Sequence, residues 1–211
     1  MARTMTPEEH ARIAEAVRAA EARTSGEIFC VVARSSAGYF FHAAFMVTLA
    51  IVILSLPVAY LLDLWWYELK PVTLVAVQLI TIACALIALA LFPALRIHLV
   101  PLSHRYGHAH ENAMKQFLGR NIHMTAARTG VLLFVSLAER YAEVLADAGI
   151  DAKVPQQTWD SVVAGLIDHA RDDRIAEGFV EAIGAVGALL AEHFPVAAGD
   201  VNELDDHVVE I

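Results

Sequence analysis

Three carboxylates follow apolar segments in the C-terminal half of the chain: Glu139, Asp147 and Asp151. Glu139 follows the run Val131–Leu137, which is typical of a buried strand, and the other two flank the next turn. Calcium takes six to eight oxygen ligands in irregular geometry, so turn carboxylates of this kind suit it. We predict a metal site at these three residues, with a divalent cation such as calcium as the candidate cofactor. The alternative is that all three are solvated turn residues.

Four histidines gather further upstream, at positions 98, 104, 108 and 110. His104 and His108 lie one helical turn apart, a spacing that metal ligands use. The chain contains no His-Glu-x-x-His pattern, however, and surface histidines remain the favoured interpretation. Glu27 opens another apolar run, and if buried it needs a partner such as Arg128 or Arg140. We expect that pair to be structural.

The common catalytic motifs are absent from the sequence. It contains no Gly-rich phosphate loop, nucleophile elbow, Cys-x-x-Cys pair or dinucleotide fingerprint. Its cysteines, Cys30 and Cys84, both lie in apolar runs and predict no disulfide. The net charge of −9 is carried largely by the C-terminal half, and this argues against a nucleic-acid partner because binding phosphates requires a basic surface.

Two uncharged apolar stretches, at about residues 40–62 and 72–95, dominate the hydropathy of the chain. Each exceeds the roughly 20 residues that a helix needs to cross a bilayer. We predict a transmembrane hairpin over residues 37–98, the alternative being two buried core helices. Arg23, Arg34, Arg96 and Arg105 flank the hairpin, whereas its connection offers only Lys70. The positive-inside rule then predicts a multi-pass protein of the bacterial inner membrane with both termini in the cytoplasm.

The remaining segments alternate between helical and strand patterns. Thr6 and Glu9 form a capping box for a first helix to about Arg23, and residues 27–33 read as a strand. After the hairpin we expect a helix from about 101 to 121, strands at 131–137 and 141–147, a helix capped by Thr158, and a last helix at 175–194. Gly184 and Gly187 should let that last helix pack closely. The strand, helix, strand order makes the first two strands parallel, and the position of the hairpin directs their carboxyl edge, the usual ligand crevice, toward the membrane.

The segment Arg128–Arg140, followed by Glu143–Ile150 and Trp159, resembles the TPM domain family, in particular a bacterial membrane-protein branch with a two-helix insertion. Shorter similar pieces are Ser25–Ile28, Ala191–Pro195 and Asn202–Leu204. The resemblance implies an α/β/α sandwich with a small mixed sheet, interrupted here by the transmembrane hairpin. It also implies roles in repair or assembly of membrane complexes, an acid-phosphatase activity and, in some members, calcium binding.

These observations predict one TPM-like domain in two parts, residues 1–36 and 99–196, followed by an acidic tail at 197–211 that is a surface extension, at most partly ordered. We predict an interaction or assembly module that works at the lipid bilayer with a membrane-protein partner or a second copy of the chain. The alternative is a metal-assisted acid phosphatase using the three carboxylates, so enzymatic activity stays open.

Overall fold

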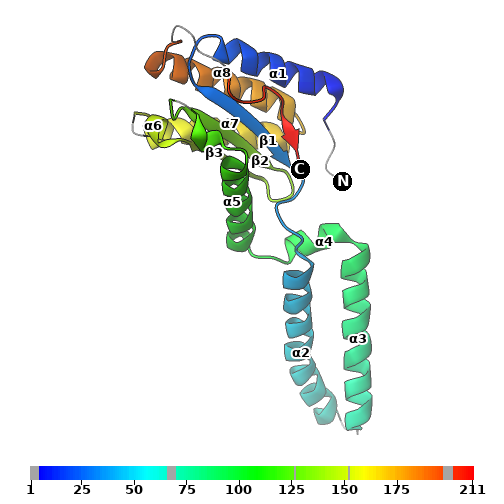
Figure 1. Cartoon of the computed structure of the whole chain (residues 1–211). Helices are drawn as coiled ribbons and strands as arrows, with labels where there is room; N and C mark the ends of the chain where they lie inside the picture. The colour runs from blue at the N-terminus through cyan, green and yellow to red at the C-terminus, as the bar shows by residue number, and fades with distance from the viewer. Residues whose placement is uncertain (1–4, 66–69, 126, 152, 197–201) are drawn as a thin grey trace. The chain divides into compact units, whose positions relative to one another are not determined.

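The computed structural model describes residues 5–65, 70–125, 127–151, 153–196 and 202–211, without the side chains of Asp151 and Gln156. The chain forms two compact units, one from residues 1–36 and 106–211 and the other from residues 37–105. The first is a mixed α/β domain (Figure 1). The second contains two long apolar helices.

The α/β unit is built around a four-stranded mixed sheet in the order β3-β2-β1-β4. Its strands are β1 (Glu27–Ala33), β2 (Gly130–Ser136), β3 (Tyr141–Ala146) and β4 (Val209–Glu210). β1 pairs in parallel with β2 and β4, and β2 pairs antiparallel with β3. All residues of β1 and β2 are buried, as expected for strands covered on both faces. The predicted parallel pair and the predicted hairpin between β2 and β3 are confirmed.

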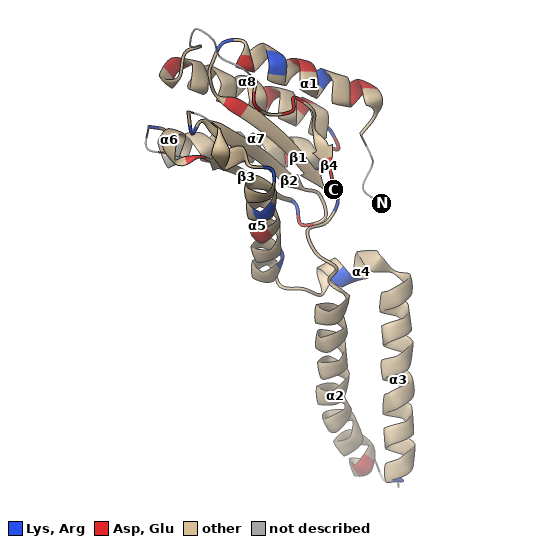
Figure 2. Ribbon diagram, viewed as in Figure 1, with Lys and Arg blue, Asp and Glu red and all other residues tan. Residues whose placement is uncertain are grey.

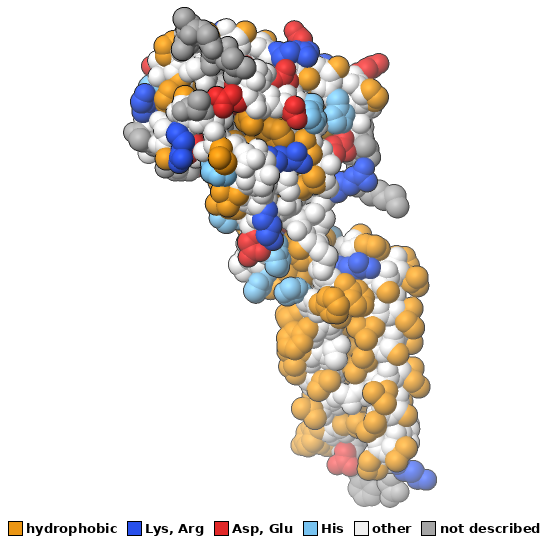
Figure 3. All heavy atoms as spheres, in the orientation of Figure 1, with side chains coloured by type: hydrophobic (Ala, Val, Ile, Leu, Met, Phe, Trp, Pro, Cys, Tyr) orange, Lys and Arg blue, Asp and Glu red, His pale blue; other side chains and the backbone are white. Residues whose placement is uncertain are grey.

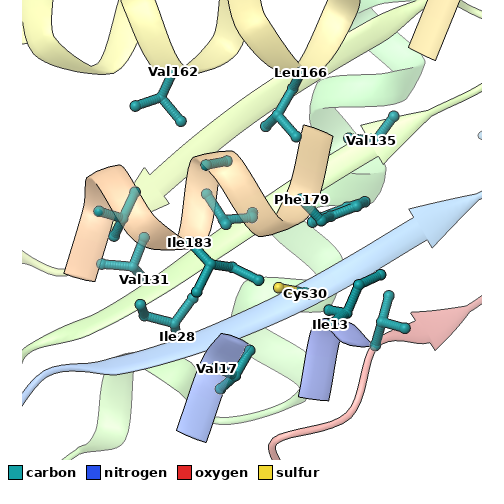
Figure 4. Packing of buried hydrophobic residues seen from close by; sticks show 14 of the residues in the cluster. Ile13, Val17, Ile28, Cys30, Val131, Val135, Val162, Leu166, Phe179 and Ile183 are labelled. Atoms are coloured by element: carbon teal, nitrogen blue, oxygen red, sulfur yellow. The ribbon is translucent and has the colours of Figure 1, made fainter. Parts of the chain in front are cut away.

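Helices cover both faces of this sheet. One face packs against α1 (Pro7–Glu21), α7 (Gln156–Arg171) and α8 (Ile175–His193). Ile13, Leu166 and Phe179 of these helices belong to the same buried cluster as Cys30 of β1 (Figure 4). The other face packs against Ala113 and Phe117 of α5 (Leu102–Gly119). The sandwich predicted from the sequence is therefore present.

Local sequence explains where several of these helices begin. Thr6 accepts a hydrogen bond from Glu9 N while Glu9 accepts one from Thr6 N, so the capping box of α1 is confirmed. The prediction that Thr158 caps a helix is wrong. α7 begins at Gln156, three residues before the expected start at Trp159; Pro155 precedes it in extended backbone, and Thr158 N donates to Pro155 O inside the first turn.

Two short helical elements complete the α/β unit. They are a 3-10 turn at Ile122–Met124 and α6 (Ala148–Asp151). The tail needs a correction, because in its described part Val209 and Glu210 form β4 on the edge of β1, and Val208 is 2% exposed. A two-residue strand is too short to leave a periodic pattern, so the sequence favoured a surface extension.

The second unit contains α2 (Phe40–Leu64), α3 (Pro71–Leu91) and the short α4 (Pro93–His98). Exposed hydrophobic side chains cover α2 and α3 (Figure 3). The second apolar helix ends at Leu91, four residues before the predicted end. Pro93 cannot donate a backbone hydrogen bond and disfavours helical backbone at Phe92, so the chain breaks there and restarts as α4.

Candidate functional site

The carboxyl ends of β1 and β2 form the edge at which the sequence predicts ligand binding. The two strands run in register, with Ala33 opposite Ser136. Ser35 and Ser36 follow β1, and Glu139 lies in the turn from β2 to β3. Parallel pairing thus brings segments about 100 residues apart in sequence to one edge.

Glu139 is the centre of a hydrogen-bonded network at this edge and is 2% exposed. Its Oε1 accepts from Ser35 Oγ at 3.2 Å and from Ser36 N at 3.0 Å. Its Oε2 accepts from Ser136 Oγ. The hydroxyls of Ser36 and Ser136 lie 2.9 Å apart, and Asn112 of α5 donates to Ser36 Oγ at 3.4 Å. Three donors therefore satisfy the buried carboxylate.

This arrangement suits a structural junction better than a catalytic centre. A serine nucleophile requires an adjacent general base and access for substrate. Glu139 is closed to solvent and already accepts three hydrogen bonds, so it offers little space to a substrate. What the network does is fix Ser35 and Ser36, and residues 37–39 alone separate Ser36 from the start of α2.

The second predicted ligand, Asp147, lies beyond the other end of β3. It is 4% exposed, its Oδ1 accepts from Ala148 N at 2.7 Å, and its Oδ2 lies 3.0 Å from Arg128 Nε. Six strand residues separate Asp147 from the turn that holds Glu139, a span of about 20 Å. The structure does not bring these two carboxylates to one site. The side chain of the third, Asp151, lies outside the described residues.

A carboxylate cluster that the sequence analysis missed lies at the amino end of β1. Buried Glu27 accepts hydrogen bonds from the backbone N–H groups of Glu203 and Leu204, both at 3.3 Å. Glu21 accepts from Ile28 N at 2.8 Å. Burial, together with the charges of Glu27 and Asp206, raises the pKa of Glu21 to about 8 against the lowering effect of Ile28 N. The sequence suggested an arginine as the partner of Glu27. The observed donors are backbone N–H groups of the C-terminal segment, and every residue type except proline carries such a group, so the sequence could not single them out.

Two histidines of α5 lie close to carboxylates of α5 and β3. His108 lies 3.7 Å from Glu111, and His110 lies 2.9 Å from Glu143 across to β3. Across the described residues, no group of three or more His, Cys, Asp or Glu side chains is arranged to hold a metal ion. The predicted calcium site therefore remains a prediction.

Comparison with known proteins agrees with this architecture. Residues 93–189 match the family model described as the TPM domain. The chain contains a TPM domain. The match begins at α4 and ends in α8, so it leaves out α1 and β1, which nevertheless supply a central strand and a covering helix of the same unit. The compact unit that contains most of this match is thus assembled from chain on both sides of the apolar helices.

The fold of the chain is also similar to a solved structure, the NMR structure of the BA42 protein from the psychrophilic bacterium Bizionia argentinensis. The TM-score is 0.60 at 19% sequence identity, over 99% of this chain and 97% of that one. The likeness supports the fold alone. No curated protein matches the sequence.

Proposed function

We propose that this is an integral membrane protein whose cytoplasmic TPM domain acts as an interaction or assembly module for membrane components. The observation that carries the proposal is the exposure of α2 and α3. Phe41, Leu56 and Val72 are 81%, 70% and 79% exposed. A core helix of a soluble protein would bury such side chains, whereas a bilayer covers them with lipid.

The dimensions of both helices suit a bilayer. α2 has 25 residues and α3 has 21, lengths of about 37 and 31 Å at the usual helical rise, against a hydrocarbon core of about 30 Å. Arg96 and Arg105 flank one end of the pair, while the connection supplies Lys70 with Asp63 and Glu68. The positive-inside rule favours a cytoplasmic location for the arginine end and so for both termini.

An interaction role fits the carboxyl edge better than hydrolysis does. The Glu139 network holds the start of the segment that leads into α2, and its carboxylate is not accessible. A domain whose chain continues directly into two membrane helices is suited to hold a membrane protein, or a second copy of itself, near the bilayer.

Membrane insertion and orientation are tested together. Alkaline carbonate extraction should leave the full-length protein in the membrane pellet, and reporters fused after Lys70 and after Ile211 should report opposite sides. Recovery in the soluble fraction, or reporters on one side, would contradict the proposal.

The assembly role requires a separate experiment. Crosslinking in native membranes followed by mass spectrometry should recover the same membrane-protein partner, or the same self-crosslinks, in repeated preparations. Recovery of no specific crosslink would contradict the role. Hydrolysis of a generic phosphate ester that depends on a divalent ion and is lost in Asp147→Asn would favour the phosphatase alternative instead.

A further inference from the structure

The unit of residues 37–105 carries its charge unevenly. Its two acidic residues, Asp63 and Glu68, both lie where α2 leads to α3. The other end of the two helices contains no acidic residue and gathers five side chains that carry or accept a proton: His42, Arg96, His98, His104 and Arg105. In Figure 2 the ribbon is blue at a basic residue of α4 and red at an acidic residue near the end of α2 that leads to α3. The end of α2 and α3 that carries Arg96 and Arg105 is therefore suited to anions.

Arg96 is already engaged in the structure. Its Nε donates to Leu89 O at 2.8 Å and its guanidinium NH2 to Ala90 O at 2.9 Å, so it caps the last carbonyls of α3 that Pro93 leaves without helical donors. Its guanidinium also lies 5.3 Å from the ring centre of Phe40. Arg96 holds the ends of α2 and α3 together and adds a positive charge there.

Arg105 has a different environment. Among the described residues its buried Nε has no hydrogen-bond partner. A guanidinium stays charged at all ordinary pH values, and a buried donor without an acceptor is costly. Arg105 lies in the first turn of α5, an 18-residue helix whose free N–H groups and dipole favour an anion at this end. Next to it, the ring of His104 lies 6.1 Å from the ring of His42 on α2.

The surroundings of Arg105 and the two histidines indicate an amphiphilic anion. Phe41 is 81% exposed and Leu102 is 56% exposed, and these apolar side chains are neighbours in sequence of His42 and of the His104–Arg105 pair. A freely diffusing anion gains nothing from such neighbours. A phospholipid places a phosphate beside its own acyl chains, and so matches both features.

We propose that Arg105, supported by His104 and His42, binds the headgroup phosphate of an anionic phospholipid at this end of the two helices. The proposal rests on the membrane insertion proposed above, which brings the ends of α2 and α3 to headgroup depth. The planar guanidinium suits two phosphate oxygens at once, and the anionic surface of the cytoplasmic leaflet attracts such a site. The protein would then be held in anionic lipid at its cytoplasmic face.

Native mass spectrometry of the full-length protein in detergent tests this with two added lipids, phosphatidylglycerol and phosphatidylcholine. Wild type should bind phosphatidylglycerol preferentially. Arg105→Gln should weaken that binding about tenfold. Arg105→Lys keeps the positive charge but loses the planar guanidinium that can donate to two phosphate oxygens, so it should weaken binding less. Lys70→Gln removes the same charge from the opposite end and should leave the affinity unchanged.

Three outcomes would overturn the lipid site: equal binding of both lipids by wild type, unchanged affinity in Arg105→Gln, or displacement of phosphatidylglycerol by millimolar inorganic phosphate. Each protein is first subjected to carbonate extraction. A wild type that stays in the membrane but fails the lipid assay refutes the lipid site alone, whereas a wild type that is extracted refutes membrane insertion.

Discussion

The backbone N–H of Ser36 donates to the Glu139 carboxylate at 3.0 Å, although the two residues lie 103 positions apart in sequence. This bond joins the segment that leaves β1 for α2 to the turn between β2 and β3. The TPM domain is therefore closed on itself at the point where the chain departs for the apolar helices.

Replacement of Glu139 should destabilise the TPM domain. Glu139→Ala leaves the donors of Ser35, Ser36 and Ser136 without their acceptor, at a cost of about 3 kcal/mol or more. Glu139→Gln keeps one acceptor oxygen, so we expect about half that loss. Thermal unfolding of the purified protein in detergent measures both. Glu15→Gln, at a side chain that is 74% exposed, serves as the control and should leave the unfolding temperature unchanged. If Glu139→Ala changed the unfolding temperature as little as Glu15→Gln does, the stabilising role of the Glu139 hydrogen bonds would be contradicted.

The sequence predicts this fold well where periodicity is strong and poorly where single contacts decide. β1 and β2 are uninterrupted apolar runs, and both were placed within a residue of their observed bounds. β4 was missed because a strand of two residues is too short to show an alternating hydrophobic pattern. The Glu139 edge follows from parallel pairing of β1 and β2, whereas its hydrogen-bond partners depend on side-chain geometry. The separation of Glu139 from Asp147 was already implied by the predicted strand at 141–147, which lies between them as β3.

The C-terminal segment should contribute to stability through Val208. It is 2% exposed and precedes β4. Val208→Ala removes two buried methyl groups, so we expect a loss of about 1–2 kcal/mol in the free energy of unfolding. Val196→Ala makes the same change at a residue that is 50% exposed and should cost much less. Equal losses from the two substitutions in denaturant titration would show that the segment does not pack as described.

Stability should fall with rising pH through Glu21. Burial and the neighbouring carboxylates raise its pKa from 4.5 to about 8. The folded state favours the protonated carboxyl of Glu21. The contribution of this group to the free energy of unfolding is therefore fully present below about pH 4.5 and is lost as the pH rises to about 8. Glu21→Gln stays neutral, so its unfolding temperature should rise relative to wild type between pH 5 and pH 9. Glu15→Gln, at a side chain that is 74% exposed and beside the permanently charged Arg18, is the matched control. A temperature difference independent of pH would refute the assignment.

Any calcium bound by the protein should not depend jointly on Glu139 and Asp147. One ion bridges ligands a few ångströms apart, whereas the length of β3 separates these carboxylates. Calorimetric titration with calcium should therefore show that Glu139→Gln and Asp147→Asn do not remove the same binding event. Loss of one binding event in both variants, with unfolding temperatures kept, would restore the site predicted from the sequence.

Two of the glycines of α8, Gly184 and Gly187, should respond oppositely to alanine. A Cβ at Gly187 would lie 2.6 Å from the Cβ of Ala20 on α1, whereas nothing lies within 4 Å of a Cβ at Gly184. The sequence predicted close packing at both positions, and the structure confirms it for Gly187 alone. Alanine in a helix interior gains roughly 0.5–1 kcal/mol over glycine, and Gly184→Ala should show this gain. At Gly187 the clash must separate α1 from α8, and overpacking of this kind costs about 1–3 kcal/mol, so the net change is destabilising. Unfolding temperatures of the two variants, measured side by side, should therefore move to opposite sides of wild type, and a rise in both would mean that α1 and α8 are not in close contact at Gly187.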